Sequence, residues 1–141
     1  MTKKAAIQNI RAFNRFYTDV IGLLNKHLLD SDYSLSEVRV MYEIATGKEV
    51  QASQIMMAMS IDKSYLSRIL KKLEKNGIVT KSLSVQDARA MSLSLTGEGQ
   101  QLFDALNKAS NHQINELIEK LNNQQLEELV LHMNAIKEIL K

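Results

Sequence analysis

The stretch from Ile61 to Thr96, IDKSYLSRILKKLEKNGIVTKSLSVQDARAMSLSLT, contains the pattern that decides the fold. With Asp62 as N-cap, it predicts a helix over residues 62–76 whose apolar residues have the i, i+3, i+4, i+7 spacing of a helix lying on a core. These apolar residues are Leu66, Ile69, Leu70 and Leu73. Asn76-Gly77 then supplies the left-handed residue that ends a helix.

The polar side of this helix is cationic. Arg68 falls opposite the apolar stripe, and hydroxyl groups lie near the helix start. A fork-shaped guanidinium and short donors near a helix N-terminus suit base edges and phosphates, although a solvated face remains the alternative for the lysines. The sequence therefore predicts that this helix carries a DNA-reading face. Its candidate contacts are Lys63, Ser64, Tyr65, Ser67, Arg68, Lys71, Lys72 and Lys75.

A β-hairpin is predicted directly after this helix, with strands over residues 80–84 and 90–95. Leu93 and Leu95 alternate with serines, which is the period of two of a strand with one buried face and one wet face. A two-stranded ribbon beside a basic helix is typical of a winged helix-turn-helix, in which the helix enters a major groove and the ribbon lies against the neighbouring backbone and minor groove.

Charged residues on the hairpin extend the candidate DNA surface. Lys81 and Arg89 are cationic, and Arg89 lies near the predicted tip, where it could enter a narrow, A·T-rich minor groove. Asp87 is the third candidate contact on the hairpin. A surface ion pair between Asp87 and Arg89, worth about 0–1 kcal/mol, is the alternative interpretation.

The preceding segment completes the predicted DNA-binding unit. Ser36 is expected to cap a helix that ends at Thr46-Gly47, and Val50-Gln51 is a candidate third strand of the wing. Residues 53–59 are expected to form the first helix of the helix-turn-helix, after Ala52, a poor N-cap residue. The start of this helix adds two candidate DNA contacts, Ser53 and Gln54.

Two segments resemble the MarR family of bacterial transcription regulators. Asp87-x-Arg89 followed by Leu95-Thr96 is similar to that family's wing signature, and Leu66-Ser67-Arg68 before Leu73-Glu74-x-x-Gly77 resembles its recognition helix. The resemblance implies dimers that pair through their N- and C-terminal helices. It also implies a pocket for a small aromatic or anionic effector between these helices and the winged domain.

A closer resemblance, to the regulator half of MarR–acetyltransferase fusion proteins, spans nearly the whole chain. The similar segments are Phe13-Asn14-Arg15-Phe16-Tyr17, Ile21-Gly22 and Leu35-Ser36-Glu37-x-Arg39-Val40-Met41-Tyr42-Glu43-Ile44. The catalytic half is absent from the sequence, so we expect either a free-standing relative or an isolated N-terminal domain. The polar lining of the effector pocket implied by the family would come from Arg11, Arg15, Tyr17 and Arg39, with surface salt bridges as the alternative role.

The flanking segments carry apolar stripes that a small winged module cannot cover. Residues 1–33 and 97–141 are predicted to form long helices, with spacings of three and four between apolar residues. Packing within the chain is the alternative, but we expect a twofold dimer. Its candidate interface residues are Ile10, Phe13, Tyr17, Val20, Leu24, Met133, Ile136 and Leu140.

Composition narrows the class of protein. The chain of 141 residues is 45% hydrophobic, has five glycines and no proline, and suits one mainly helical domain. The net charge is only +2, yet residues 60–91 hold seven basic and three acidic side chains, while residues 97–141 hold four and seven. The positive charge is therefore concentrated on the predicted DNA-binding motif.

Sequence gives no sign of an enzyme, a metal protein or a membrane protein. There is no cysteine, no phosphate-binding glycine loop and no nucleophile motif. The three histidines lack metal-ligand spacing, and His112 with Glu116 at i+4 is more simply a half-exposed structural pair. No apolar run approaches a membrane span, and Met1-Thr2-Lys3-Lys4 does not lead into a signal-peptide core. We expect no cofactor and a cytoplasmic protein.

Taken together, the sequence predicts a mainly α protein with a small β-wing. Residues 34–96 would form a winged helix-turn-helix, framed by long N- and C-terminal dimerisation helices within a single domain, residues 1–141. The expected function is that of a dimeric transcriptional repressor, which binds a pseudo-palindromic operator in double-stranded DNA and is relieved by a small effector. The alternative is a regulatory DNA-binding or interaction domain that serves an acetyltransferase, in cis or as a partner.

Overall fold

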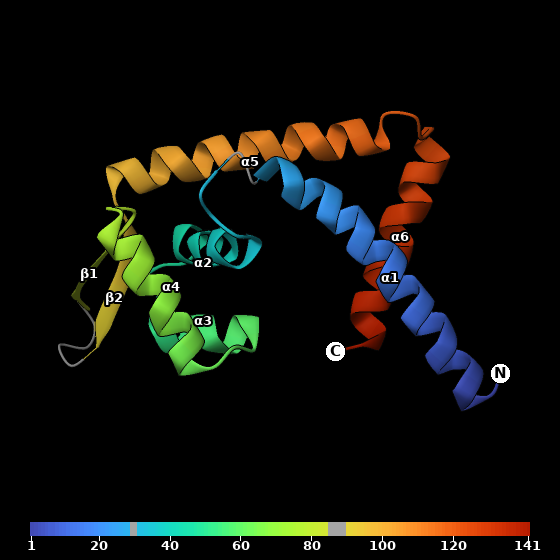
Figure 1. The fold of residues 1–141 in the computed structure, drawn as a ribbon, viewed down its shortest axis with the longest axis horizontal. Helices are drawn as coiled ribbons and strands as arrows, with labels where there is room; N and C mark the ends of the chain where they lie inside the picture. The colour runs from blue at the N-terminus through green and yellow to red at the C-terminus, as the bar shows by residue number, and fades with distance from the viewer. Residues whose placement is uncertain (29–30, 85–89) are drawn as a thin grey trace.

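The computed structural model describes residues 1–28, 31–84 and 90–141, with residues 23–28 described by their backbone alone. Figure 1 shows a mainly helical chain with one two-stranded antiparallel sheet, which confirms the predicted fold class. The elements are α1 (Lys3–Leu28), α2 (Leu35–Thr46), α3 (Ala52–Met59), α4 (Lys63–Lys75), β1 (Val79–Leu83), β2 (Met91–Leu95), α5 (Gly97–Ile118) and α6 (Asn123–Ile139).

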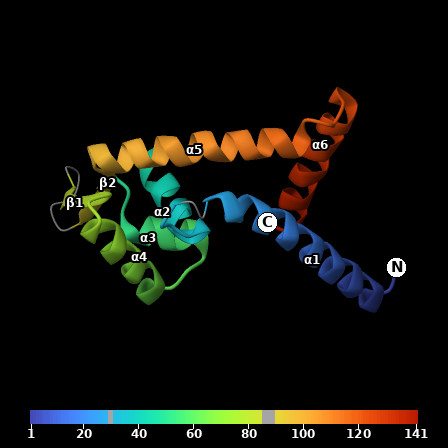
Figure 2. The same cartoon turned by 45° about the horizontal axis from the view of Figure 1, so that its top comes forward.

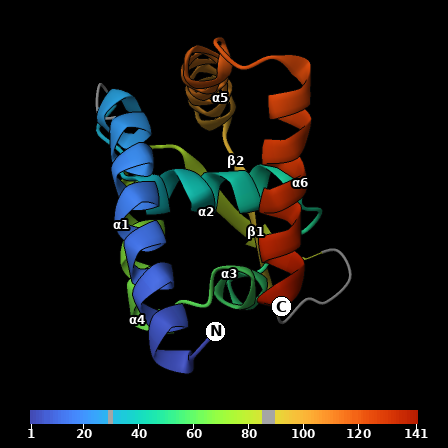
Figure 3. The same cartoon turned by 90° about the vertical axis from the view of Figure 1, so that its right-hand side faces the viewer.

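The molecule has a compact end and an open end. Helices α2, α3 and α4 gather with the hairpin at one end of α5, whereas α1 and α6 lie at the other (Figures 1 and 2). Figure 3 shows α1 and α6 standing apart on either side of the view, with α5 between them at the top. A single helix, α5, therefore connects the hairpin to α6 across the length of the molecule.

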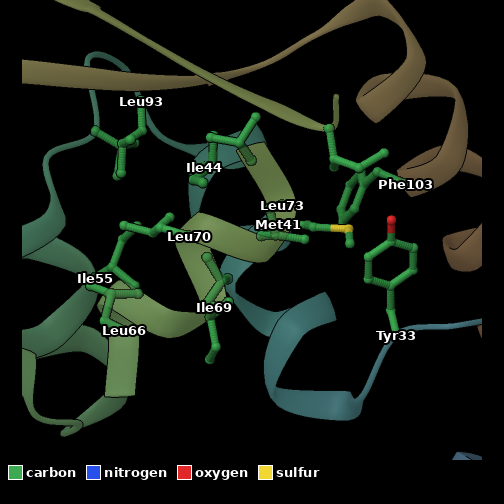
Figure 4. Close-up of a cluster of buried hydrophobic side chains, with 14 of the residues drawn as sticks. Tyr33, Met41, Ile44, Ile55, Leu66, Ile69, Leu70, Leu73, Leu93 and Phe103 are labelled. Carbon is green, nitrogen blue, oxygen red and sulfur yellow. The ribbon is translucent and has the colours of Figure 1, made fainter. Parts of the chain in front are cut away.

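The hydrophobic core lies in the compact end. Its buried apolar residues form one cluster, and Figure 4 shows Leu66, Ile69, Leu70 and Leu73 of α4 reaching into it. Leu66 is 1% exposed and Leu73 is fully buried. The other members come from α2, α3, the sheet, the first half of α5, the segment before α2 and the loops that hold Val50 and Ile78. This packing fixes which face of α4 remains outside.

The ends of α4 follow the local sequence signals. Asp62 accepts a hydrogen bond from the backbone N–H of Tyr65 at 2.7 Å, as an N-cap should. After the helix, Gly77 has a φ of +73°, the left-handed conformation that the Asn76-Gly77 pair predicted. Likewise, Thr96 caps α5, and Asn122 with Gln125 forms a capping box at the start of α6, where the sequence carries this local signal.

Two predicted helix starts were wrong. Ser34, not Ser36, caps α2: its hydroxyl accepts from the Glu37 N–H, and the Glu37 carboxylate accepts from the Ser34 N–H, a reciprocal pair that Ser36 is too far into the helix to make. Helix α3 begins at Ala52 rather than Ser53, because Gln51 is its N-cap and the Gln51 N–H donates to Gln54 Oε1 at 2.9 Å.

The hairpin is slightly displaced from its predicted bounds. Its register pairs Val79 with Leu95 and Leu83 with Met91. The proposed third strand at Val50-Gln51 is reduced to a single bridge, in which the Leu93 N–H donates to the Val50 carbonyl at 2.7 Å. Ser92 is buried, contrary to the predicted wet face. It lies on the face of the sheet that carries Ser84, whose hydroxyl is 3.2 Å from Glu49 Oε2 of the loop before α3.

None of the described helices combines the length and the hydropathy needed to cross a membrane.

Candidate nucleic-acid interface

Burial of the apolar stripe directs the cationic face of α4 outward. Ser64, Arg68, Lys71 and Lys75, on the side of the helix away from the apolar stripe, are all exposed. Lys63 and Tyr65, near the start of the helix, are exposed as well, whereas Ser67 is half-buried on the side that faces the wing. The structure thus leaves most of the predicted helix contacts accessible.

A groove of about 590 Å³ runs between α3, α4 and the wing. Its rim carries five of the predicted DNA contacts, and its floor is formed by side chains such as Met56, Leu70 and Leu93. Met91 of β2 also lines the groove, a residue that sequence reasoning did not select. The five predicted contacts on the rim are Ser53, Lys63, Ser67, Lys71 and Lys81.

Lys81 connects the wing to α4. Its ammonium lies 3.2 Å from Glu74 Oε1, an ion pair without hydrogen-bond geometry. The carboxylate of Glu74 also lines the groove, so one acidic side chain lies among the cations there. The pair holds the first strand of the wing beside the helix, and Lys81 remains 44% exposed.

A second, shallower hollow of about 310 Å³ lies on the opposite side of α4, between that helix and the start of α2. Tyr65 and Arg68 line it together with Ile69 and Lys72. The guanidinium carbon of Arg68 lies 5.8 Å from the centre of the Tyr65 ring. Gln54 lies in neither of these two hollows: it caps α3 and lines a separate hollow with Glu43 and Lys48.

Lys72 differs from the other lysines of α4 because its ammonium is engaged by the protein. It donates to the Asp32 carbonyl at 2.9 Å and to Glu37 Oε1 at 3.0 Å, and it lies 5.1 Å from the centre of the Tyr33 ring. In the next turn, the Asn76 amide donates to the Tyr33 hydroxyl at 3.1 Å. Sequence reasoning missed Tyr33, Glu37 and Asn76, and the Ser34-x-x-Glu37 box was the signal available for Glu37.

Glu37 is ionised in this arrangement. Burial of its carboxyl group opposes ionisation, but hydrogen bonds from the Ser34 N–H and Lys72, together with the charge of Lys72, outweigh burial and lower the pKa of Glu37. A charged pair with Lys72 therefore joins α2 to α4 near neutral pH.

Several predicted residues lie elsewhere or cannot be placed. Asp87 and Arg89, the candidate contacts at the wing tip, lie outside the described residues. Arg39 forms an i, i+4 ion pair with Glu43 at 2.8 Å, which is the alternative role named for it. Arg11 and Arg15 are exposed on α1, and none of the four proposed effector residues lines the three hollows described here.

The candidate dimer residues lie at the open end of the molecule. Ile10, Phe13 and Leu140 are 58%, 45% and 77% exposed, and no residue of α6 is buried. Val20 and Tyr17 are half-buried, and the Tyr17 ring stacks on Phe13 with centres 5.7 Å apart. The Leu24 side chain lies outside the described residues. Met133 and Ile136 are exposed on α6 as well.

The one histidine pair singled out from the sequence is a surface contact. His112 Nε2 lies 3.2 Å from Glu116 Oε1, and both side chains are more than half exposed. Across the described ranges, no group of three or more His, Cys, Asp or Glu side chains is arranged to hold a metal ion.

Comparison with known proteins agrees with this geometry. Residues 33–91 match the model of the MarR family. The HTH-type transcriptional regulator SarZ of Staphylococcus saprophyticus is 26% identical over 98 residues, covering 70% of this chain and about two thirds (67%) of SarZ. The middle of the chain is therefore similar to MarR-family transcriptional regulators.

Solved structures show the same fold over nearly the whole chain. FabT of Streptococcus pneumoniae, in complex with DNA, is 19% identical with a TM-score of 0.81, over 95% of this chain and 96% of FabT. A mutant MarR from E. coli, complexed with operator DNA, is 20% identical with a TM-score of 0.78, over 94% and 95% of the two chains. The long helices outside residues 33–91 are thus part of a shared architecture.

Proposed function

We propose that this MarR-type chain is a dimeric, sequence-specific DNA-binding repressor that acts in the cytoplasm. Each subunit would lay α4 in a major groove of a pseudo-palindromic operator, with half-sites roughly one helical turn apart. The observation that carries the proposal is the groove between α3, α4 and the wing, because five predicted DNA contacts from three elements meet at its rim. DNA complexes of FabT and of a mutant MarR, which share this fold, support DNA binding as the function.

The contacts divide by chemistry. Arg68, with the hydroxyls of Ser64 and Tyr65, would read base edges, because these groups can make directional bonds in a major groove. Lys63, Lys71 and Lys75 would contact phosphates and fix the register. Ser53, Ser67 and Lys81 would hold the backbone beside the wing, and Arg89 with Asp87 would extend this surface into the minor groove.

Dimerisation is proposed through residues 1–33 and 97–141. An exposed helix such as α6, with several large apolar side chains and no buried residue, requires a covering surface. A second copy of the chain offers one by twofold symmetry, which would also place two reading helices on one face of DNA. Residues 34–96 would then serve as the DNA-binding part of a single domain.

Relief by a small aromatic or anionic effector completes the proposal. Arg11, Arg15 and Tyr17 lie on α1 and Arg39 on α2, so a ligand held by them would bear on the dimerisation helix and the winged part together. Binding to one arrangement of the dimer in preference to the other would shift the DNA affinity. Isothermal titration with aromatic carboxylates, with and without operator, tests this part.

Selection of bound sites from a random double-stranded DNA library tests the main proposal. The expected result is an inverted repeat whose half-site centres lie roughly one helical turn apart. Recovery of unrelated sequences with equal efficiency would instead indicate nonspecific binding and would contradict it. The matched control is the Arg68→Ala variant, which should recover no consensus.

The kinship with MarR–acetyltransferase fusions stays a prediction. It would become the better account if the gene continues past Lys141 into an acetyl-CoA-binding domain, or if the chain co-purifies with an acetyltransferase and the library selection yields no consensus.

A further inference from the structure

We propose that Lys72 is a positioning residue: it ties the recognition helix to the segment between α1 and α2, and thereby sets the half-site separation that a dimer reads. Only the part of this inference that concerns the reading of DNA rests on the proposed function. Its physical basis is a cluster that we call the clasp, made of Asp32, Tyr33, Glu37, Lys72 and Asn76.

The contacts within the clasp fix the position of the Lys72 ammonium group. The ammonium donates hydrogen bonds of 2.9 Å to the Asp32 carbonyl and 3.0 Å to Glu37 Oε1. It also lies 5.1 Å from the centre of the Tyr33 ring. Charge-assisted bonds of this kind are stronger than neutral ones. A cation over an aromatic face adds a further attraction.

Two of the partners of Lys72, Tyr33 and Glu37, are themselves held in place. Tyr33 is buried in the core cluster, and its hydroxyl accepts from Asn76 one turn further along α4. Glu37 is fixed by the Ser34 N–H in the α2 capping box. The C-terminal half of α4 is therefore bonded at two successive turns to residues 32–37.

Location gives the clasp its significance. Residues 32 and 33 lie between α1, which carries part of the proposed dimer interface, and α2, which packs in the winged part. A tie from α4 to this point restricts how the reading helix can tilt relative to α1. In a twofold dimer, that tilt determines how far apart the two reading helices lie.

A phosphate contact is the competing role for Lys72. Its side chain is 42% exposed, so DNA could reach it, but the Glu37 side chain is only 12% exposed. If the Lys72 ammonium moved to a phosphate, the largely buried Glu37 carboxylate would lose its cation, which is energetically unfavourable. Lys71, the next residue, faces the groove beside the wing instead and serves as the matched control.

The first arm of the test needs no DNA. The chain has no cysteine, so cysteines introduced at exposed Gln8 of α1 and Ser64 of α4 can carry the only two spin labels. Labelled chains are diluted in excess unlabelled chain, and the distance distribution is measured by pulsed electron resonance. Lys72→Met should broaden or shift the distribution, Lys71→Met should leave it unchanged, and Lys72→Arg should restore it.

Glu37→Gln provides a second route should Lys72→Met fold poorly. The glutamine keeps a carbonyl oxygen for the Ser34 N–H but removes the negative charge that faces Lys72. It should therefore broaden the distribution as Lys72→Met does. An unchanged distribution in either folded variant would overturn the proposal.

The second arm uses operators whose half-site separation differs by one base pair. Lys72→Met should reduce the preference for the best separation by at least about fivefold, in the range of ordinary coupling between sites, without changing the salt dependence of binding. Lys71→Met should keep the preference and lower the salt slope by about one. A Lys72→Met variant that behaves like Lys71→Met would overturn the proposal.

The two arms separate the clasp from the proposed function. Should the wild-type chain select no DNA sequence while Lys72→Met still broadens the distance distribution, the repressor function fails and the tie between α4 and residues 32–37 stands. Should DNA be read normally with no change in either arm, the clasp alone is overturned.

Discussion

The Arg68 guanidinium carbon lies 5.8 Å from the centre of the Tyr65 ring, one turn earlier on α4. Residues three apart face the same side of a helix, so the ring can restrain the guanidinium without leaving the exposed surface. A cation over an exposed aromatic ring is worth about 0.5–1 kcal/mol. Tyr65 thus holds Arg68 outward before any DNA is bound, which reduces the side-chain freedom that binding would remove.

Arg68→Ala should abolish specific operator binding and leave the fold and the dimer intact. Arg68 is exposed opposite the buried stripe, and a bidentate contact with guanine is worth about 1–3 kcal/mol. Electrophoretic shifts on cognate and scrambled DNA measure the effect. Lys108→Ala, at an exposed position on α5 that is not a proposed DNA contact, is the control and should leave both affinities unchanged. Unchanged affinity of Arg68→Ala for cognate DNA would show that Arg68 does not read bases.

Lys75→Ala should weaken binding about equally on cognate and scrambled DNA. An exposed lysine that contacts phosphate acts through counterion release, so the slope of log affinity against log salt should fall by about one. Titrations at three or more salt concentrations provide the slope. Lys108→Ala on α5 is the control and should change neither quantity. A loss confined to cognate DNA would assign base reading to Lys75.

Much of α4 could be predicted because its signals are local. The Leu66, Ile69 and Leu73 spacing defines a face within a few turns, and Asp62 and Gly77 mark the two ends through their immediate neighbours. The same holds for Thr96 and Asn122 at the later helices. Periodicity and capping require no knowledge of distant residues.

The role of Lys72 could not be predicted from local sequence in this way. Helical spacing places it on the flank of the cationic face, and nothing local separates it from Lys71 or Lys75. Its partners, Asp32 and Glu37, are 40 and 35 residues away in sequence, so only the tertiary fold identifies them. The Ser36 cap was a different failure, because the local Ser34-x-x-Glu37 signal was present and competes directly with it.

Gly99→Ala should destabilise the protein by about 1–3 kcal/mol, the usual cost of overpacking. A Cβ atom at Gly99 would lie 2.1 Å from the backbone carbonyl oxygen of Ile78, so α5 would have to move away from the loop after α4. Gly97→Ala, two residues earlier in open space, is the matched control and should be neutral or stabilising by about 0.4–1 kcal/mol. Urea unfolding of both variants checks this, and equal stabilities would contradict the close approach.

Ile136→Glu should prevent assembly of the proposed dimer. Ile136 is a large apolar residue exposed on α6, and a buried interfacial carboxylate without a partner is strongly unfavourable. Because monomer stability and dimerisation should be coupled, we expect aggregate or unfolded chain in sedimentation experiments. The neighbouring Lys137→Glu tests whether negative charge on α6 is harmful in itself. A stable, fully helical Ile136→Glu monomer would contradict the dimer.

Acid should remove the contribution of Glu37 to stability. Its pKa is lowered in the folded chain because bonds from Ser34 and Lys72 and the charge of Lys72 outweigh the opposing effect of burial. A carboxyl group of this kind stabilises the fold at pH values above its unfolded pKa, and this stabilisation is lost as the pH falls through the folded pKa.

The Glu37→Gln variant should therefore be less stable than wild type at neutral pH, and the difference should shrink as the solution is acidified. Urea unfolding from neutral pH down into the range where glutamate titrates provides the two curves. Glu43→Gln, which breaks only the surface pair with Arg39, is the matched control and should lower stability by about 0.3–0.5 kcal/mol at neutral pH. A difference in stability between wild type and Glu37→Gln that stays constant across the whole range would show that ionisation of Glu37 does not stabilise the fold.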